Sequence, residues 1–193
     1  QGVPVVSMHW MVADSKRCLV LEPMEEGLRI HENPIGVLTN NPPFEFHRTN
    51  LNNYLNLTCQ TPENRFSSQL SLQPYGQGMG AMGLPGDPSP ASRFVRAAFY
   101  RNNSVCEPGE EAGVTQFFHL LSSVAMVQGS AVTPQGKLDR TTYSCCSLQE
   151  GIYYYRTYEN SRIHGIKLFT EALQGSEISA FPLAVHQEIH FDN

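Results

Sequence analysis

The sequence predicts an α+β fold, because strand-like patterns come first along the chain, helical patterns follow, and strand-like patterns return at the end. Short runs with partial alternation of apolar and polar residues fill 5–38. Apolar residues recur at helical spacing within 44–128, and runs rich in β-formers occupy 141–191. No internal repeat or low-complexity tract interrupts this order.

The N-terminal strands are expected to be short and closely spaced. Turn formers such as Asn33 and Pro34 separate neighbouring runs. The expected strands are 5–13, 17–22, 27–31 and 35–38. Four strands at this spacing imply an antiparallel sheet.

Two amphipathic helices are expected, one in the first half of the chain and one in the second. The first covers 44–55 and follows Pro42 and Pro43. The second covers 110–128, has one apolar face, and begins with two glutamates that suit the positive end of a helix. These helices add a layer to the sheet.

A further helix is expected directly after the turn-rich loop 83–88. Ser89 suits the N-cap, and Pro90 suits the first helical position. Arg93 then lies in the first turn, where a cation opposes the helix dipole. This unfavourable placement suggests a functional role; an ordinary surface arginine is the alternative.

The remaining segments carry weaker patterns. Residues 56–82 are polar and lack a period, which indicates a surface excursion or a subunit contact. The last strands are expected at 141–148, 151–158, 163–169, 177–185 and 188–191.

Composition excludes several classes of protein. The chain has 193 residues, 40% hydrophobic and 16% charged, which fits one sizeable globular domain over 1–193. The net charge is −5 and no basic stripe occurs, so a nucleic-acid partner is not expected. No apolar run approaches the roughly 18 residues that span a bilayer, and the first residues lack a signal-peptide pattern. We therefore expect a soluble, cytoplasmic protein without a membrane partner.

Motifs for metals and nucleotides are weak. Five cysteines, an odd number without framework spacing, indicate reduced thiols. Seven histidines lack the companion spacing of metal sites, so neither a metal nor a cofactor is expected. Residues 78–83 match G-x-G-x-x-G but lack the preceding strand and the directly following helix that dinucleotide binding needs.

Asn40 is a better candidate for chemistry. It stands at the end of an expected strand, just before two prolines turn the chain into a helix. A side-chain amide offers uncharged N–H donors, which suit an oxyanion hole. A structural asparagine in a turn is the alternative.

Four segments taken together resemble the choloylglycine hydrolase family, which includes bile salt hydrolases and penicillin V acylases. They are LTNNPPFEFHRTNLNNY, GLPGDPSPASRFVRAAF, FFHLLSSVAMVQGS and GIYYYRTYEN. The likeness runs nearly end to end and is greatest to bile salt hydrolases of gut bacteria. It implies an N-terminal-nucleophile hydrolase with a four-layer αββα sandwich, a homotetramer, conjugated bile acids as substrates, and no cofactor.

The resemblance also implies roles for three residues. In the family a cysteine exposed as the mature first residue attacks the amide, and its own α-amino group is the base. Asn40 matches the oxyanion-hole asparagine, and Arg93 matches the arginine beside the nucleophile, where a guanidinium favours the thiolate. Val3 matches an apolar contact of the steroid pocket.

The chain departs from the family pattern at its start, because the match begins roughly one third of the way into a family member. The nucleophilic cysteine, together with an arginine, an aspartate and a second asparagine, has no counterpart, and Gln1 is not a nucleophile. None of the five cysteines stands where the nucleophile should; they are Cys18, Cys59, Cys106, Cys145 and Cys146. We therefore expect residues 1–193 to be the C-terminal portion of a single domain, with the N-terminal third missing, and to be inactive alone.

The function expected from the sequence is cleavage of the amide in glycine- or taurine-conjugated bile acids by the intact protein. Penicillin V acylase is the alternative enzyme. A non-catalytic truncated relative, acting as a ligand-binding or partner subunit, is the alternative from another class.

Overall fold

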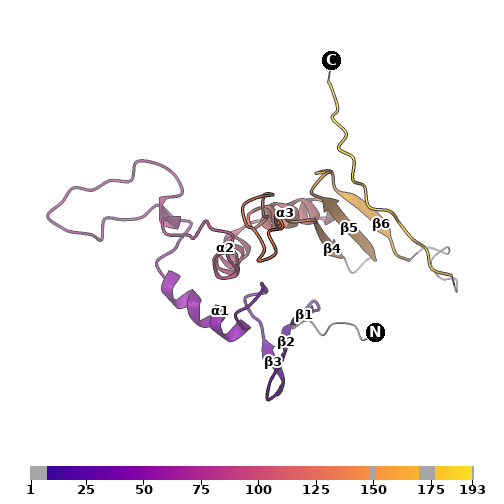
Figure 1. Cartoon of the computed structure of the whole chain (residues 1–193). Coiled ribbons are helices and arrows are strands. Elements are labelled where there is room, and N and C mark those ends of the chain that lie inside the picture. Colours follow the sequence, from indigo (N-terminus) through magenta and orange to yellow (C-terminus); the bar gives the residue numbers. More distant parts are fainter. Residues whose placement is uncertain (1–7, 148–150, 170–176, 193) are drawn as a thin grey trace. The chain divides into compact units, whose positions relative to one another are not determined.

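The computed structural model describes residues 8–147, 151–169 and 177–192. The chain divides into two compact units, Gln1–Ser104 and Val105–Asn193. Figure 1 labels the helices and strands of each unit. No helix among the described residues is long and apolar enough to cross a membrane.

The first unit begins with an antiparallel sheet, as the sequence predicted, but the sheet has three strands where four were expected. Its strands are β1 (Trp10–Ala13), β2 (Cys18–Met24) and β3 (Gly27–Glu32). β2 is central, and Leu21 faces Trp10 on one side and Ile30 on the other. Because side chains alternate along a strand, these three residues share one face, and Val20 and Glu22 share the other.

The fourth predicted strand, 35–38, is wrong. The buried side chain of Asn33 closes a turn there: its Nδ2 donates to the carbonyl of Val37 at 3.0 Å, and its Oδ1 accepts from the amide of Gly36 at 2.9 Å. Gly36 has a φ of +65°, and a Cβ on it would lie 2.4 Å from the guanidinium carbon of Arg101. A glycine-specific turn therefore replaces an extended strand.

The helical elements of this unit include both predicted helices and one short 3₁₀ turn that was not predicted. They are α1 (Phe44–Asn50), the 3₁₀ turns η1 (Leu51–Tyr54) and η2 (Met79–Ala81), and α2 (Pro90–Asn103). The predicted helix 44–55 is thus an α-helix continued by a 3₁₀ turn. The predicted N-cap is confirmed, since Ser89 accepts a hydrogen bond from the amide of Ser92 at 3.3 Å.

A small apolar core joins the sheet to both helices. It consists of Val20, Val37, Phe44, Phe94 and Ala98. The rings of Phe44 and Phe94 meet edge to face, with centroids 6.2 Å apart, and both side chains are fully buried. This contact sets α1 against α2 on the inner face of β2.

The described segment between η1 and η2 forms neither helix nor strand and extends as an open loop (Figure 1). Several of its apolar side chains are exposed, among them Phe66 and Tyr75. The glycine motif at 78–83 contains η2, which is a single 3₁₀ turn. No strand precedes it in the described range 55–78, so the context for dinucleotide binding is absent there.

The second unit packs one helix on another three-stranded antiparallel sheet. Its elements are α3 (Glu110–Ser122), β4 (Tyr143–Ser147), β5 (Ile152–Thr157) and β6 (His164–Lys167), with β5 central. Arg156 of β5 lies over the ring of Phe118 at 5.2 Å and donates to the hydroxyl of Ser122 at 2.6 Å. Burial lowers the pKa of the Arg156 guanidinium.

α3 ends at Ser122, six residues before the predicted end at 128. The hydroxyl of Ser122 donates to the carbonyl of Phe118 at 2.7 Å, and that of Ser123 donates to the carbonyl of Leu120 at 2.7 Å. The carbonyls of Leu121 and Ser122 accept from the backbone amides of Val124 and Ala125, three positions on, so the α-helix ends in tighter turns.

The strands predicted at 177–185 and 188–191 are wrong, since the described residues 177–192 form no strand. Side chains of β5 and the following turn hold this segment instead. Thr157 Oγ1 donates to the carbonyl of Ala184 at 2.7 Å, and Asn160 Nδ2 donates to the carbonyl of His186 at 2.8 Å. In Figure 1 the segment runs past β5 and β6 and then leaves the sheet.

Candidate active site

Asn40 and Arg93, the two predicted site residues within the described part of the chain, are in direct contact. Arg93 Nη2 donates to Asn40 Oδ1 at 2.6 Å, across 53 positions of sequence. A guanidinium can only donate, so Asn40 turns its oxygen toward Arg93 and its nitrogen away. Among the described residues Asn40 Nδ2 has no hydrogen-bonding partner, so both of its N–H groups remain available as donors.

The turn that carries Asn40 is fastened to both helices of its unit. Thr39 Oγ1 donates to the carbonyl of Pro90, at the start of α2, at 3.0 Å. His47 Nε2, in α1, lies 2.9 Å from the carbonyl oxygen of Asn40. The chain then passes through a cis Asn41–Pro42 peptide bond into α1.

The loop before α2 holds Arg93 in place. Arg93 Nε donates to the carbonyl of Pro88 at 3.0 Å. Asp87 accepts hydrogen bonds from Ser89 and Ser92, and these lower its pKa to about 2. Asp87 is therefore ionised at neutral pH, and its negative charge at the helix N-terminus offsets the unfavourable placement of Arg93.

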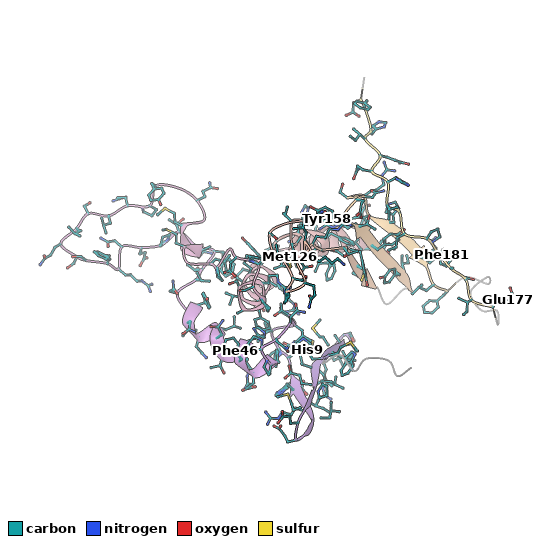
Figure 2. All side chains as sticks on the ribbon, in the orientation of Figure 1. His9, Phe46, Met126, Tyr158, Glu177 and Phe181 are labelled. Carbon is teal, nitrogen blue, oxygen red and sulfur yellow. The ribbon has the colours of Figure 1, made fainter. Side chains whose placement is uncertain are left out.

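A cleft of about 400 Å³ opens beside Asn40. Apolar and polar groups share its wall, which suits a ligand with both kinds of surface. The lining residues are Met8, His9, Trp10, Glu22, Pro23, Met24, Asn40, Asn41 and Pro43. His9 is labelled in Figure 2.

One lining residue, the buried carboxylate of Glu22, was not predicted from the sequence. The residue is 3% exposed, and its Oε1 accepts from the amide of Phe44 at 2.9 Å and lies 3.1 Å from His9 Nδ1. His31 Nε2 lies 3.6 Å from Oε2. Glu22 thus ties β2 to the first residue of α1. A lone acidic residue inside the apolar run LVLEPM was the signal that could have revealed it.

Val3, the predicted steroid contact, lies outside the described residues. The five cysteines are free thiols, and none of them lines the cleft described above. Burial raises the pKa of the Cys18 and Cys146 thiols, which is opposite to what activates a nucleophile.

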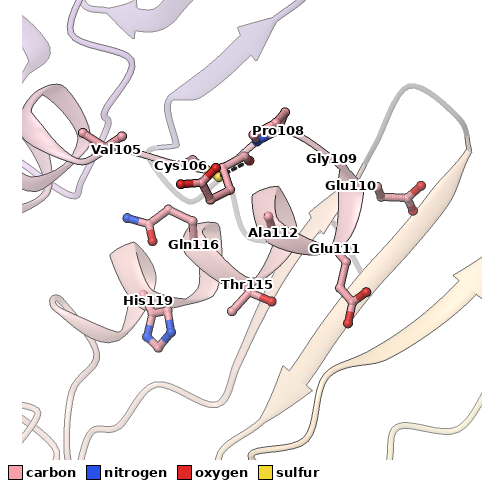
Figure 3. A pocket seen from close by; sticks show the side chains of 11 residues that line it. Val105, Cys106, Pro108, Gly109, Glu110, Glu111, Ala112, Thr115, Gln116 and His119 are labelled. Carbon is pink, nitrogen blue, oxygen red and sulfur yellow. Dashed lines mark hydrogen bonds between the residues drawn. The ribbon is translucent and has the colours of Figure 1, made fainter.

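An open cavity of about 730 Å³ in the second unit is a weaker candidate (Figure 3). It lies beside the start of α3 and contains Cys106, whose thiol donates to the carbonyl of Glu107 at 3.2 Å. Across the described residues, no three histidine, cysteine or acidic side chains are grouped so that they could hold a metal ion. The cleft beside Asn40 remains the candidate active site, because Asn40, which contacts Arg93, lines it.

The model of one protein family matches residues 3–181 of this chain. That family is described as linear amide C–N hydrolases, choloylglycine hydrolase family. The chain belongs to the choloylglycine hydrolase family. The resemblance drawn from the four sequence segments is thereby confirmed.

Proteins similar to this chain are named as hydrolases of bile salts or conjugated bile acids. A bile salt hydrolase/transferase of Lactiplantibacillus plantarum is 48% identical over 184 residues, which are 95% of this chain and 57% of that protein. A mutant conjugated bile acid hydrolase from Clostridium perfringens has a crystal structure that matches with a TM-score of 0.89 and 40% identity, over 100% of this chain and 59% of that chain. This chain thus spans somewhat over half the length of these relatives.

Penicillin V acylase is a more distant structural neighbour. The enzyme from Agrobacterium tumefaciens matches with a TM-score of 0.63 and 19% identity, over 86% of this chain and 46% of that chain. At this identity the likeness shows a shared fold and carries no argument about substrate.

Proposed function

We propose that the protein containing this chain is a bile salt hydrolase, which cleaves the amide bond of glycine- or taurine-conjugated bile acids. The observation that carries the proposal is the hydrogen bond between Arg93 and Asn40, which joins two family motifs beside a cleft. The names of relatives at 40% and 48% identity support this substrate class over penicillin V.

In the proposed mechanism a cysteine thiolate, from the part of the family fold that this chain does not match, attacks the amide carbonyl. Asn40 Nδ2 donates to the oxyanion that forms, and the positive charge of Arg93 favours the thiolate. The amine takes up a proton and leaves as glycine or taurine. Water then attacks the thioester, which releases the bile acid and regenerates the thiol. Val3 contributes an apolar contact to the steroid.

We propose that residues 1–193 form the C-terminal portion of a single domain with the four-layer αββα sandwich. Helices α1 and α2 cover one face of the first sheet, where Val20 lies. The other face carries exposed apolar side chains, and Trp10, Val12 and Ile30 are 46%, 55% and 61% exposed. A second sheet packed on this face would complete the sandwich, because sheet-on-sheet packing buries apolar side chains of both inner faces.

We also propose a homotetramer in the cytoplasm of a gut bacterium, with the open loop between η1 and η2 as a subunit contact. The exposed rings of Phe66 and Tyr75 suit such a contact. Light scattering of the intact protein tests this proposal. Replacing both rings with serine is expected to reduce the tetramer to smaller species, and an unchanged tetramer would remove the loop from the interface.

Incubation of the intact protein with glycocholate, taurocholate and penicillin V tests the function. Release of glycine or taurine is expected, and Asn40→Ala is expected to lower kcat about 10²- to 10³-fold, the usual effect of losing one oxyanion donor. Asn53→Ala, at an exposed position of η1, is the matched control and is expected to retain activity. Cleavage of penicillin V with no release from the conjugates would favour the acylase, and no cleavage at all would favour a non-catalytic relative.

A further inference from the structure

We propose that His47 is a positioning residue that orients Asn40 by holding its main-chain carbonyl. The consequence for catalysis rests on the proposed function, whereas the effect on the geometry of Asn40 does not.

The His47 ring is fully buried, and its Nε2 lies 2.9 Å from the carbonyl oxygen of Asn40. A carbonyl oxygen can only accept, so Nε2 carries the proton of this hydrogen bond. The other ring nitrogen, Nδ1, is buried and has no hydrogen-bonding partner in the described structure. Nε2 also lies 3.5 Å from the hydroxyl oxygen of Thr39, the residue before Asn40. Within the described structure the polar contacts of this buried ring are therefore made to the Asn40 turn.

Aromatic contacts keep the ring from turning. Phe94 stacks on it with centroids 4.7 Å apart and an interplanar angle of 13°, and Phe46 meets it edge-on at 5.6 Å and 78°. Phe94 directly follows Arg93 in α2. The same ring that holds the Asn40 main chain is therefore packed against the helix that carries the partner of the Asn40 side chain.

Asn40 is consequently held at two points, its main-chain oxygen by His47 and its side-chain oxygen by Arg93. Two fixed oxygens determine where Nδ2 points. Without His47, Asn40 would be held by the exposed hydrogen bond to Arg93 and, one residue earlier, by the bond from Thr39 to the carbonyl of Pro90, and its own carbonyl could shift. A displacement of about 1 Å in a catalytic group can lower a rate about 10²-fold.

Two variants of the intact protein separate positioning from simple packing. His47→Gln retains an N–H at the reach of Nε2, whereas His47→Met has a similar length and no donor. We expect His47→Met to lower kcat on glycocholate about 10- to 100-fold with KM changed less than about 3-fold, and His47→Gln to restore kcat to within about 3-fold of the parent protein. His119→Met, at an exposed position of α3, is the control.

Crystal structures of the two variants give a readout that is independent of activity. We expect the distance from Arg93 Nη2 to Asn40 Oδ1 to stay near 2.6 Å in His47→Gln and to exceed hydrogen-bonding range in His47→Met. An unchanged contact and an unchanged kcat in His47→Met would overturn the proposal, as would equal losses of kcat and melting temperature in both variants. If the parent protein releases no amine from the conjugates, the proposed function fails, and the crystallographic distances still decide the role of His47.

Discussion

The two three-stranded sheets of this protein hold their neighbours in different ways. The inner face of the first sheet packs through Val20 against the rings of Phe44 and Phe94, with one buried carboxylate beside them. The second sheet holds the segment after residue 176 mainly through side-chain hydrogen bonds, such as that from Thr157 to Ala184. Apolar packing positions the candidate active site, and polar contacts hold a segment outside it.

This contrast between apolar packing and polar contacts indicates which contacts can be lost without displacing the candidate active site. Removing a buried aromatic ring loses apolar burial and leaves a cavity, whereas removing one hydroxyl loses a single hydrogen bond. Substitutions in the first unit are therefore expected to have larger effects on stability and on the Asn40 turn than substitutions in the second.

The largest effect is expected from Phe94→Ala. This ring is fully buried against Phe44 and His47, so we expect a loss of about 3–5 kcal/mol in the free energy of unfolding and a lower kcat. Urea unfolding of the intact protein measures it. Phe66→Ala is the matched control, because that ring is 83% exposed. Similar losses in the free energy of unfolding for the two variants would contradict the view that buried aromatic packing stabilises the first unit.

Glu22→Leu is expected to have the next largest effect. It leaves the buried amide of Phe44 without an acceptor, and an unsatisfied buried donor costs about 1–3 kcal/mol. Glu22→Gln keeps an acceptor oxygen and is expected to recover most of this loss. Urea unfolding of both variants tests the point, and equal stability of Glu22→Leu and the parent protein would show that the carboxylate does not hold α1.

Tyr155→Phe should have a smaller effect. It removes the phenolic oxygen that accepts from the amide of Ala184 at 3.3 Å, a contact worth about 0.5–1.5 kcal/mol. The rest of the ring remains stacked on His164. We expect faster proteolysis after residue 176 with little change in kcat. A loss as large as that of Phe94→Ala would contradict the contrast between the units.

The smallest effect is expected from Asp87→Asn, because Asp87 is exposed, and this effect should be present at neutral pH and disappear in acid. The pKa of Asp87 is lowered from 3.8 to about 2, so its contribution to stability is present above pH 4 and is lost as the pH falls from 4 toward 2. The variant lacks this contribution at neutral pH, and its melting temperature should fall less steeply over that window. Melting curves from pH 2 to 7 measure it, and parallel curves for variant and parent would contradict the assignment.

Local patterns predicted many of the elements and drew attention to Asn40 and Arg93, whose roles in the site are proposals. The start of α2 at Pro90 followed from Ser89 and the preceding loop, because cap chemistry depends on adjacent residues. The strand predicted at 35–38 failed because a turn closed by Asn33 requires Gly36, which lies close to the distant Arg101. The strands predicted after residue 176 failed because side chains of β5 replaced backbone partners. Sequence pattern reports intrinsic preference, and tertiary contacts override it at such places.

By itself the sequence determined the α+β order, the family, and the choice of Asn40 and Arg93 as candidates, since each depends on residue types and their spacing. Only the tertiary structure decided that Arg93 donates to Asn40, that the buried Glu22 lines the cleft, and that His47 contacts the Asn40 carbonyl. These contacts join residues that are from seven to 53 positions apart. The reason is physical: spacing along a chain constrains neighbours within an element, whereas the packing of α1 and α2 on β2 sets the distances between elements.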